Sequence, residues 1–69
     1  MKLYSKSELE HLINEWVVGR NAKRNKRIIR DKLINGLTVF QIAEKYKLSQ
    51  TRTKTVIRTF RRHIESLEQ

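Results

Sequence analysis

The sequence predicts an all-α domain of four helices with a helix-turn-helix at its C-terminal end. Three observations support this prediction: apolar residues recur at helical spacing, residues that favour helix starts stand just before these segments, and both glycines fall between them. Proline is absent, so no residue type in the chain forces a break in a helix. At 69 residues we expect one domain, residues 1–69, that buries only about 60% of the surface of the unfolded chain.

The first predicted helix covers about residues 6–18. Ser5 and Glu8 have the S-x-x-E spacing of a capping box, in which each side chain accepts a hydrogen bond from the other residue's backbone N–H. Apolar residues follow at i, i+3, i+4, i+7 and i+8, and they are Leu9, Leu12, Ile13, Trp16 and Val17. Because apolar stripes usually face inward, we expect Trp16 in the core in preference to an interface with another protein.

The second predicted helix lies between the two glycines. Gly19 is placed to end the first helix in a left-handed cap, and Asn21 can cap a helix that runs to Asn35 and stops at Gly36. The inward face of this helix comprises Ile28, Ile29 and Leu33. Residues 20–32 carry seven basic residues against one acidic residue, so the rest of the helix is expected to form a cationic surface.

A short third helix and a tight turn come next. Thr38 and Gln41 form a T-x-x-Q capping box, so the helix is expected to begin directly after Thr38. Its narrow buried side comprises Ile42, Ala43 and Tyr46. The turn is the segment 47–49, with Leu48 directed inward and Ser49 well suited to cap the helix that follows.

The fourth predicted helix is long and has two distinct faces. Its apolar stripe comprises Thr53, Val56, Ile57, Phe60, Ile64 and Leu67. Its opposite face comprises Thr51, Lys54, Thr55, Arg58 and Arg62, and it contains no carboxylate. Most charged helix faces are simply solvated, but a capped helix and a tight turn directly before this one favour a helix that enters the major groove of DNA.

The chemistry of the outward face suits base edges and phosphates. Lys54 and Arg58 can donate hydrogen bonds to guanine O6 and N7, and threonine can meet a thymine methyl group or a phosphate. The flanking Arg52 and Arg61 can reach the DNA backbone, and Arg62 lies further along the helix, where a phosphate contact is expected.

Residues 30–58 resemble the fourth conserved region of bacterial sigma factors, and small phage and prophage regulators with the same layout. The matching pieces are Gly36-Leu37-Thr38, Ile42-Ala43, Leu48-Ser49 and Val56, and the resemblance covers roughly the C-terminal forty residues. It implies a sequence-specific regulator of transcription that binds double-stranded DNA and comes from a phage, a prophage or a mobile element. The residues that it implies to face DNA are Ser49, Gln50, Thr51, Lys54, Thr55 and Arg58.

Two residues depart from the pattern of that family. Lys47 stands where the family commonly has glycine, so the turn must hold a side chain at a position that often has a positive φ. Thr53 replaces an aliphatic residue between the turn and Val56, which is expected to weaken the core there and to allow a slight shift of the helix.

The second helix offers another basic surface. Lys23, Arg27 and Arg30 lie at i, i+4 and i+7, a spacing that suits the phosphates beside the groove. Two interpretations stay open, because the same residues also suit a surface that only keeps a small protein soluble. The first helix is nearly neutral and is not expected to touch DNA.

Charge and residue usage exclude several other classes of protein. The formal net charge of +9 points to a polyanionic partner. No nucleophile stands beside a base and no glycine-rich phosphate loop is present, so the sequence indicates neither an enzyme nor a small-molecule substrate. With no cysteine and two isolated histidines, no metal ion or other cofactor is expected. No segment reads as a membrane span or a signal peptide, so we expect a cytoplasmic protein.

Two mechanisms and one different class of function stay open. A homodimer could bind two DNA half-sites, or a monomer could act beside RNA polymerase as a sigma-like activator. The different class is a basic helical adaptor or inhibitor that binds an acidic protein. RNA is disfavoured as a ligand, since sequence-specific RNA modules stack unpaired bases on exposed aromatic residues and Phe60 lies in the apolar stripe.

Overall fold

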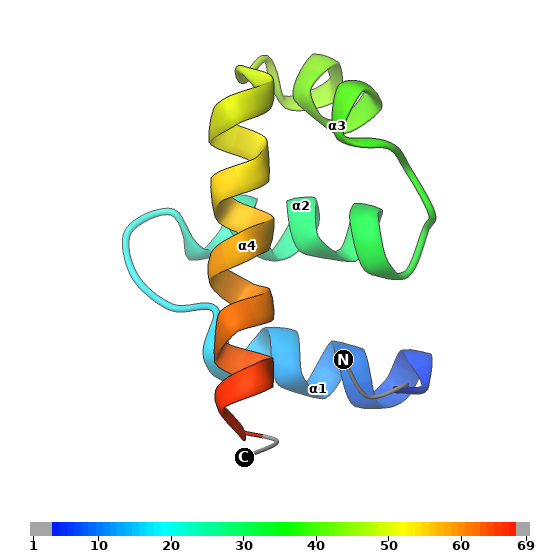
Figure 1. Ribbon diagram of the computed structural model, residues 1–69, viewed down its shortest axis with the longest axis vertical. Coiled ribbons are helices and arrows are strands. Elements are labelled where there is room, and N and C mark those ends of the chain that lie inside the picture. Colours follow the sequence, from blue (N-terminus) through cyan, green and yellow to red (C-terminus); the bar gives the residue numbers. More distant parts are fainter. Residues whose placement is uncertain (1–3, 68–69) are drawn as a thin grey trace.

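Four helices make up the part of the chain that the computed structural model describes, residues 4–67 (Figure 1). They are α1 (Lys6–Trp16), α2 (Ala22–Leu33), α3 (Val39–Tyr46) and α4 (Gln50–Leu67). The three shorter helices follow one another along α4 and cross it at steep angles, with α1 near the C-terminal end of α4 and α3 at its start. The predicted all-α, four-helix fold is therefore confirmed.

The predicted capping residues begin three of the four helices. The Oγ atom of Ser5 accepts from the Glu8 N–H at 3.2 Å, and the Ser5 N–H donates to Glu8 at 3.1 Å. Thr38 and Gln41 form the same reciprocal pair at 3.1 and 2.9 Å. Because these pairs depend only on residues three apart, the sequence was sufficient to predict them.

The connection between α1 and α2 differs from the prediction. Helix α1 ends at Trp16, about two residues earlier than predicted. Val17 has an extended backbone, and its side chain is buried in the core. Gly19 has a φ of +103° but lies outside the helix end. Asn21 is the N-cap residue of α2, as predicted, but its side chain makes no capping hydrogen bond.

The end of α2 also comes earlier than predicted, at Leu33 in place of Asn35. Gly36 has a φ of +75°, and this turn lets the Leu37 N–H donate to the Asp31 carbonyl at 2.9 Å. The positive φ at Gly36 therefore allows the chain to reverse toward α3, as the sequence indicated.

The core consists of two clusters joined along α4. One comprises Ile13, Val17, Ile29, Phe60 and Ile64, and the other comprises Ile28, Ile42 and Ile57. Val56 packs against both clusters, so it connects the half of the core under α1 with the half under α3.

Two members of the predicted apolar stripes are not in the core. Trp16 is 36% exposed, because Ile13 and Val17 make the contact between α1 and the core and leave the indole to one side. The indole stacks on the His63 ring with 6.0 Å between ring centroids. Leu67 is 48% exposed, because it lies beyond Ile64, the last buried residue of α4.

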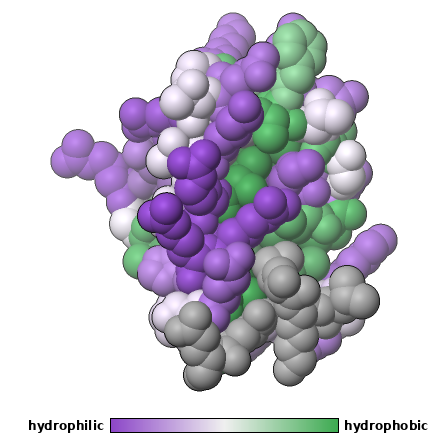
Figure 2. Space-filling view, in the orientation of Figure 1, coloured by the Kyte–Doolittle hydropathy of each residue, from purple (hydrophilic) through white to green (hydrophobic). Residues whose placement is uncertain are grey.

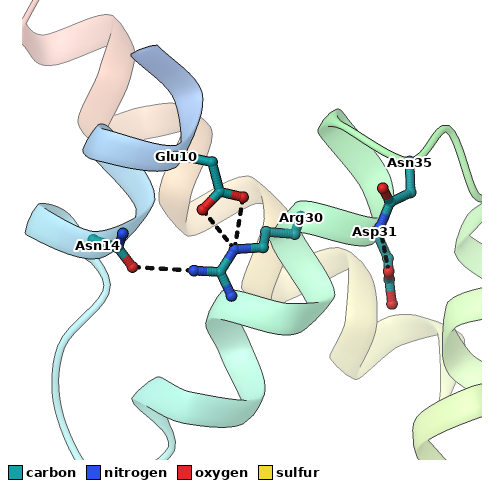
Figure 3. Close-up of polar contacts among 5 residues, drawn as sticks. All are labelled: Glu10, Asn14, Arg30, Asp31 and Asn35. Carbon is teal, nitrogen blue, oxygen red and sulfur yellow. Dashed lines mark hydrogen bonds and ion pairs between the residues drawn. The ribbon is translucent and has the colours of Figure 1, made fainter. Parts of the chain in front are cut away.

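Polar contacts tie α2 to the helices on both sides of it. The Arg30 Nε donates to both carboxylate oxygens of Glu10 on α1, at 2.8 and 2.9 Å. The next residue, Asp31, points away from α1 and accepts a hydrogen bond from Asn35 at 2.9 Å (Figure 3). Asp31 also accepts from the Lys45 ammonium at 2.9 Å and from the Tyr46 hydroxyl at 2.8 Å, both on α3.

Within residues 4–67, no helix is long and apolar enough to cross a membrane. The same part of the chain contains no group of His, Cys, Asp and Glu side chains that could hold a metal ion.

Candidate nucleic-acid interface

The turn between α3 and α4 fixes how the two helices meet. Lys47 has a φ of +56°, as expected for a position where glycine is common. The Lys47 N–H donates to the Glu44 carbonyl at 3.3 Å, and the Leu48 N–H donates to the Ala43 carbonyl at 2.9 Å. This is the Schellman pattern, which satisfies carbonyl groups that a helix end would leave free. Leu48 then packs against the cluster around Ile42, as predicted.

The first turn of α4 is held by two short-range hydrogen bonds. The Oγ atom of Ser49 accepts from the Arg52 N–H at 3.0 Å, which confirms Ser49 as the cap. Thr53 is fully buried, and its hydroxyl donates to the Ser49 carbonyl at 3.0 Å. The departure from an aliphatic residue at Thr53 therefore leaves no unpaired hydroxyl in the core.

The predicted outward face of α4 is solvent-exposed along its whole length. It comprises Thr51, Lys54, Thr55, Arg58 and Arg62, hereafter the α4 outward face. Ser49 and Gln50 are exposed at its N-terminal end, and Arg52 and Arg61 flank it. In the space-filling view, hydrophilic side chains form a broad band over α4 (Figure 2).

The two threonines of this face differ in what they can offer. The Thr55 hydroxyl donates to the Thr51 carbonyl at 3.0 Å, so its hydrogen is already used within the helix. The Thr51 hydroxyl makes no hydrogen bond within residues 4–67 and keeps its donor. Thr55 can therefore present a methyl group and an acceptor, while Thr51 can still donate.

The cations of α4 have no acidic partner among residues 4–67. The ion pairs of this region join His11 to Glu15, Arg30 to Glu10 and Lys45 to Asp31, and none involves α4. The unpaired cations of α4 are Arg52, Lys54, Arg58, Arg61 and Arg62. They create a concentrated positive potential, to which the N-terminal dipole of the helix adds.

The basic surface of α2 is only partly the one predicted. Lys23 and Arg27 are exposed, but Arg30 is turned toward α1, where Glu10 and Asn14 occupy its guanidinium (Figure 3). The helical spacing placed three cations near one another, but the hydrogen bonds to the Glu10 carboxylate orient the third, Arg30, toward α1. We therefore remove Arg30 from the candidate DNA surface.

Two arginines that the sequence did not single out extend this surface. Arg20 and Arg24 line a hollow together with Lys23, Arg27 and Tyr46. Arg24 also borders a second groove against the start of α4, so it connects the α2 surface with Arg52. Only the excess of bases in residues 20–32 indicated them, because their position depends on how α2 packs against α4.

Asp31 is the main buried charge of the described residues, and it stabilises α3 against α2. Burial raises the pKa of the Asp31 carboxyl, but hydrogen bonds from Asn35, Lys45 and Tyr46 outweigh burial and hold that pKa below its ordinary value. The hydrogen bond to Asp31 raises the pKa of Lys45, so both partners stay charged at neutral pH. This network helps to set the angle at which α3 precedes α4.

Comparisons of the chain with protein-family models, with curated proteins and with solved structures find no match. Three features of the molecule bear on its function: a capped α3, a left-handed turn at Lys47, and an α4 whose exposed face carries unpaired cations.

Proposed function

We propose that this protein is a sequence-specific regulator of transcription that binds double-stranded DNA in the cytoplasm. The observation that carries the proposal is the exposed, acid-free α4 outward face, presented by a helix whose start is capped and whose preceding turn is fixed. An α-helix with its side chains is about as wide as the major groove of B-DNA, about 12 Å, so such a face can be inserted there. The resemblance to the fourth region of sigma factors, in phage or mobile-element regulators, supports the same function.

The positions along α4 suggest separate roles. Lys54 and Arg58 lie one turn apart on the α4 outward face, where they can donate to guanine O6 and N7. Thr55, between them, can place its methyl group against a thymine methyl. Arg52 and Arg61 flank the face and can meet phosphates on either side of the groove.

The α2 surface supports the same arrangement from outside the groove. Lys23 and Arg27 are exposed and line the same hollow as Tyr46 at the end of α3, and Arg24 between them also lines a groove with Arg52 of α4. Contacts from these cations to the DNA backbone would add affinity for any sequence without adding preference.

The salt dependence of binding tests whether the protein binds DNA through contacts to phosphates. For each phosphate that is contacted, DNA affinity should fall by about 0.9 log units for a tenfold rise in salt. Fluorescence anisotropy with labelled duplexes measures this dependence. A flat dependence between low and physiological ionic strength would favour the adaptor that binds an acidic protein.

Two substitutions on α4 test sequence recognition itself. Arg58→Ala should reduce the preference for a selected site over random DNA by about 1–3 kcal/mol, since a bidentate contact to guanine discriminates between bases. Arg62→Ala is the matched control and should weaken both kinds of DNA by similar factors. Competition assays at one fixed salt concentration measure both effects. Equal losses on selected and random DNA for Lys54→Ala, Thr55→Ala and Arg58→Ala alike would contradict base recognition by α4.

One observation favours a protein contact in addition to DNA. Phe40 is 56% exposed on α3, on a helix that the proposal places outside the groove. An exposed aromatic ring suits a contact with RNA polymerase or with a second copy of the chain. Sedimentation with and without DNA separates a monomer from a homodimer, and Phe40→Ala should leave DNA affinity unchanged if the ring serves only a protein contact.

A further inference from the structure

A groove of about 570 Å³ is lined by residues of α4, of the α1–α2 connection and of the start of α2, and we call it the α2–α4 groove. Figure 1 shows the α1–α2 connection beside α4. Its apolar lining includes Trp16, Val18 and Val56, and the buried residues Val17, Ile29 and Phe60 lie beneath them. At one end stands the stacked pair of Trp16 and His63, with an interplanar angle of 24°. The volume falls within the range of sites that hold small organic ligands, about 300–1,000 Å³.

The guanidinium of Arg24 has no partner in the described part of the chain. Its Nε atom is buried without a hydrogen-bond partner, and its terminal nitrogens make no hydrogen bond within residues 4–67. Buried polar atoms in proteins are nearly always paired, so an arginine that lines a groove without a partner suits an anion from outside the chain. Arg24 forms no ion pair within residues 4–67.

The charge of the groove has one sign. Arg24 and Arg52 line it, and none of the side chains that line it among residues 4–67 is acidic. An arginine fork beside an apolar surface matches a carboxylate or sulfonate group carried on a ring. An uncharged apolar compound would leave Arg24 unpaired, and a hydrophilic anion would leave the apolar lining and Trp16 uncovered.

We propose that the α2–α4 groove binds a small aromatic organic anion. The charged group of the ligand pairs with the terminal nitrogens of Arg24, and the ring lies on the apolar lining beside Trp16. This site is separate from the α4 outward face, although Thr51, Arg52 and Thr55 border both. The shared border makes a ligand in the groove a competitor of DNA, and this one consequence rests on the proposed function.

Anilinonaphthalene sulfonate is the probe for this site, and N-phenylnaphthylamine supplies the same rings without the charge. The full chain is titrated with each probe in the absence of DNA, and energy transfer from Trp16, the sole tryptophan, reports binding near the groove. We expect one saturable site per chain for the sulfonate. No saturable site, or several equivalent sites, would overturn the proposal.

Two arginine variants separate the groove from general attraction to a basic protein. Arg24→Ala should weaken sulfonate binding about tenfold or more, as expected for a lost charge-assisted hydrogen bond, and should leave the uncharged probe within about twofold. Arg27→Ala removes an exposed arginine one turn further along α2, outside the groove, and should change neither. Equal losses in both variants, or equal losses of both probes, would contradict the site.

Circular dichroism checks that the variants stay folded. If Arg24→Ala melts at a lower temperature than the parent chain, Arg24→Lys repeats the comparison with the charge kept and the fork removed, and a smaller selective loss of sulfonate binding is expected.

Addition of DNA then tests whether a ligand in the groove and DNA compete for the residues that border both sites. Sulfonate binding that persists in saturating DNA would overturn the competition between the two ligands and leave the groove site standing, whereas displacement supports it.

Discussion

At the scale of single residues, Asp31 shows how one carboxylate joins two helices. It lies almost fully buried on α2 and accepts hydrogen bonds from Lys45 and Tyr46 on α3 and from Asn35 on its own helix. Hydrogen bonds to a charged group contribute about 1.5–3 kcal/mol each at most, and Lys45 is half exposed, so its share is smaller. The position of α3 therefore depends on the charge of one side chain.

We expect this charge to make stability depend on pH in the acid range. The folded-state pKa of Asp31 is lowered, so its contribution is fully present above the unfolded-state value of about 3.9 and is lost as the pH falls through the folded-state pKa. At neutral pH, Asp31→Asn should reduce the free energy of unfolding by about 2 kcal/mol. Urea denaturation at several pH values measures the difference between the two proteins, which should shrink as the pH falls below about 4. A difference that stays constant down to pH 2 would contradict this role, and Glu15→Gln, at an exposed site, is the control.

Thr55 allows its methyl group and its hydroxyl to be tested separately. Its hydroxyl already donates to the Thr51 carbonyl, so we expect the methyl group to face the bases. Thr55→Val keeps the methyl group and should retain the preference for the selected site, while Thr55→Ser removes it and should reduce that preference by about 0.8 kcal/mol. Competition binding gives both values. The opposite order would show that the hydroxyl oxygen makes the contact.

At the scale of elements, the turn before α4 holds a strained residue. Lys47 adopts the left-handed conformation, which is unfavourable by about 1–2 kcal/mol for a residue with a Cβ atom. Lys47→Gly removes this backbone strain, but glycine also gains conformational freedom in the unfolded chain. The net effect should be a rise in the free energy of unfolding of up to about 1 kcal/mol. Glu44→Gly, inside α3, should lower it by about 1 kcal/mol. Thermal denaturation compares them, and a destabilised Lys47→Gly would mean that the lysine side chain makes a stabilising contact.

The elements also show which features a sequence can predict. Caps at Ser5, Thr38 and Ser49 depend on neighbours within a few residues, and all three were predicted from the residues themselves. The positive φ at Lys47 was expected from the family resemblance, in which glycine is common at that position. The direction of Arg30 depends on Glu10, twenty residues away on another helix, and the α2 pattern alone placed it with the wrong surface. Hydrogen bonds between residues a few positions apart can therefore be predicted from the sequence. Which neighbouring helix a long side chain such as Arg30 contacts can be known only once the packing of the helices is known.

At the scale of the whole molecule, the small core concentrates stability in a few side chains. Phe60 is buried in the cluster that joins α1, α2 and α4, whereas Trp16 is 36% exposed at its edge. Phe60→Ala should cost about 3–5 kcal/mol, which approaches the total stability of a domain this small. Trp16→Ala should cost only about 1–2 kcal/mol. Thermal melting followed by circular dichroism ranks the two, and an equal loss would place the indole among the core residues.

The same packing explains why the candidate site was only partly predictable. The α4 outward face could be predicted from periodicity, because one helix supplies all of it. The contributions of Arg20 and Arg24 could not, because they come from a different helix and depend on how α2 lies beside α4. The exposure of Trp16 has the same origin, since its neighbours Ile13 and Val17 take the inward positions.

The unpaired cations of α4 have a consequence for the free protein. Like charges at i and i+4, such as Lys54 and Arg58 or Arg58 and Arg62, repel each other and oppose folding when no DNA is present. Added salt screens this repulsion, so a rise in ionic strength should stabilise the fold while it weakens the complex. Under the proposed function, the phosphates of bound DNA would neutralise this repulsion, so substitutions on the α4 outward face that stabilise the free chain are expected to weaken DNA binding.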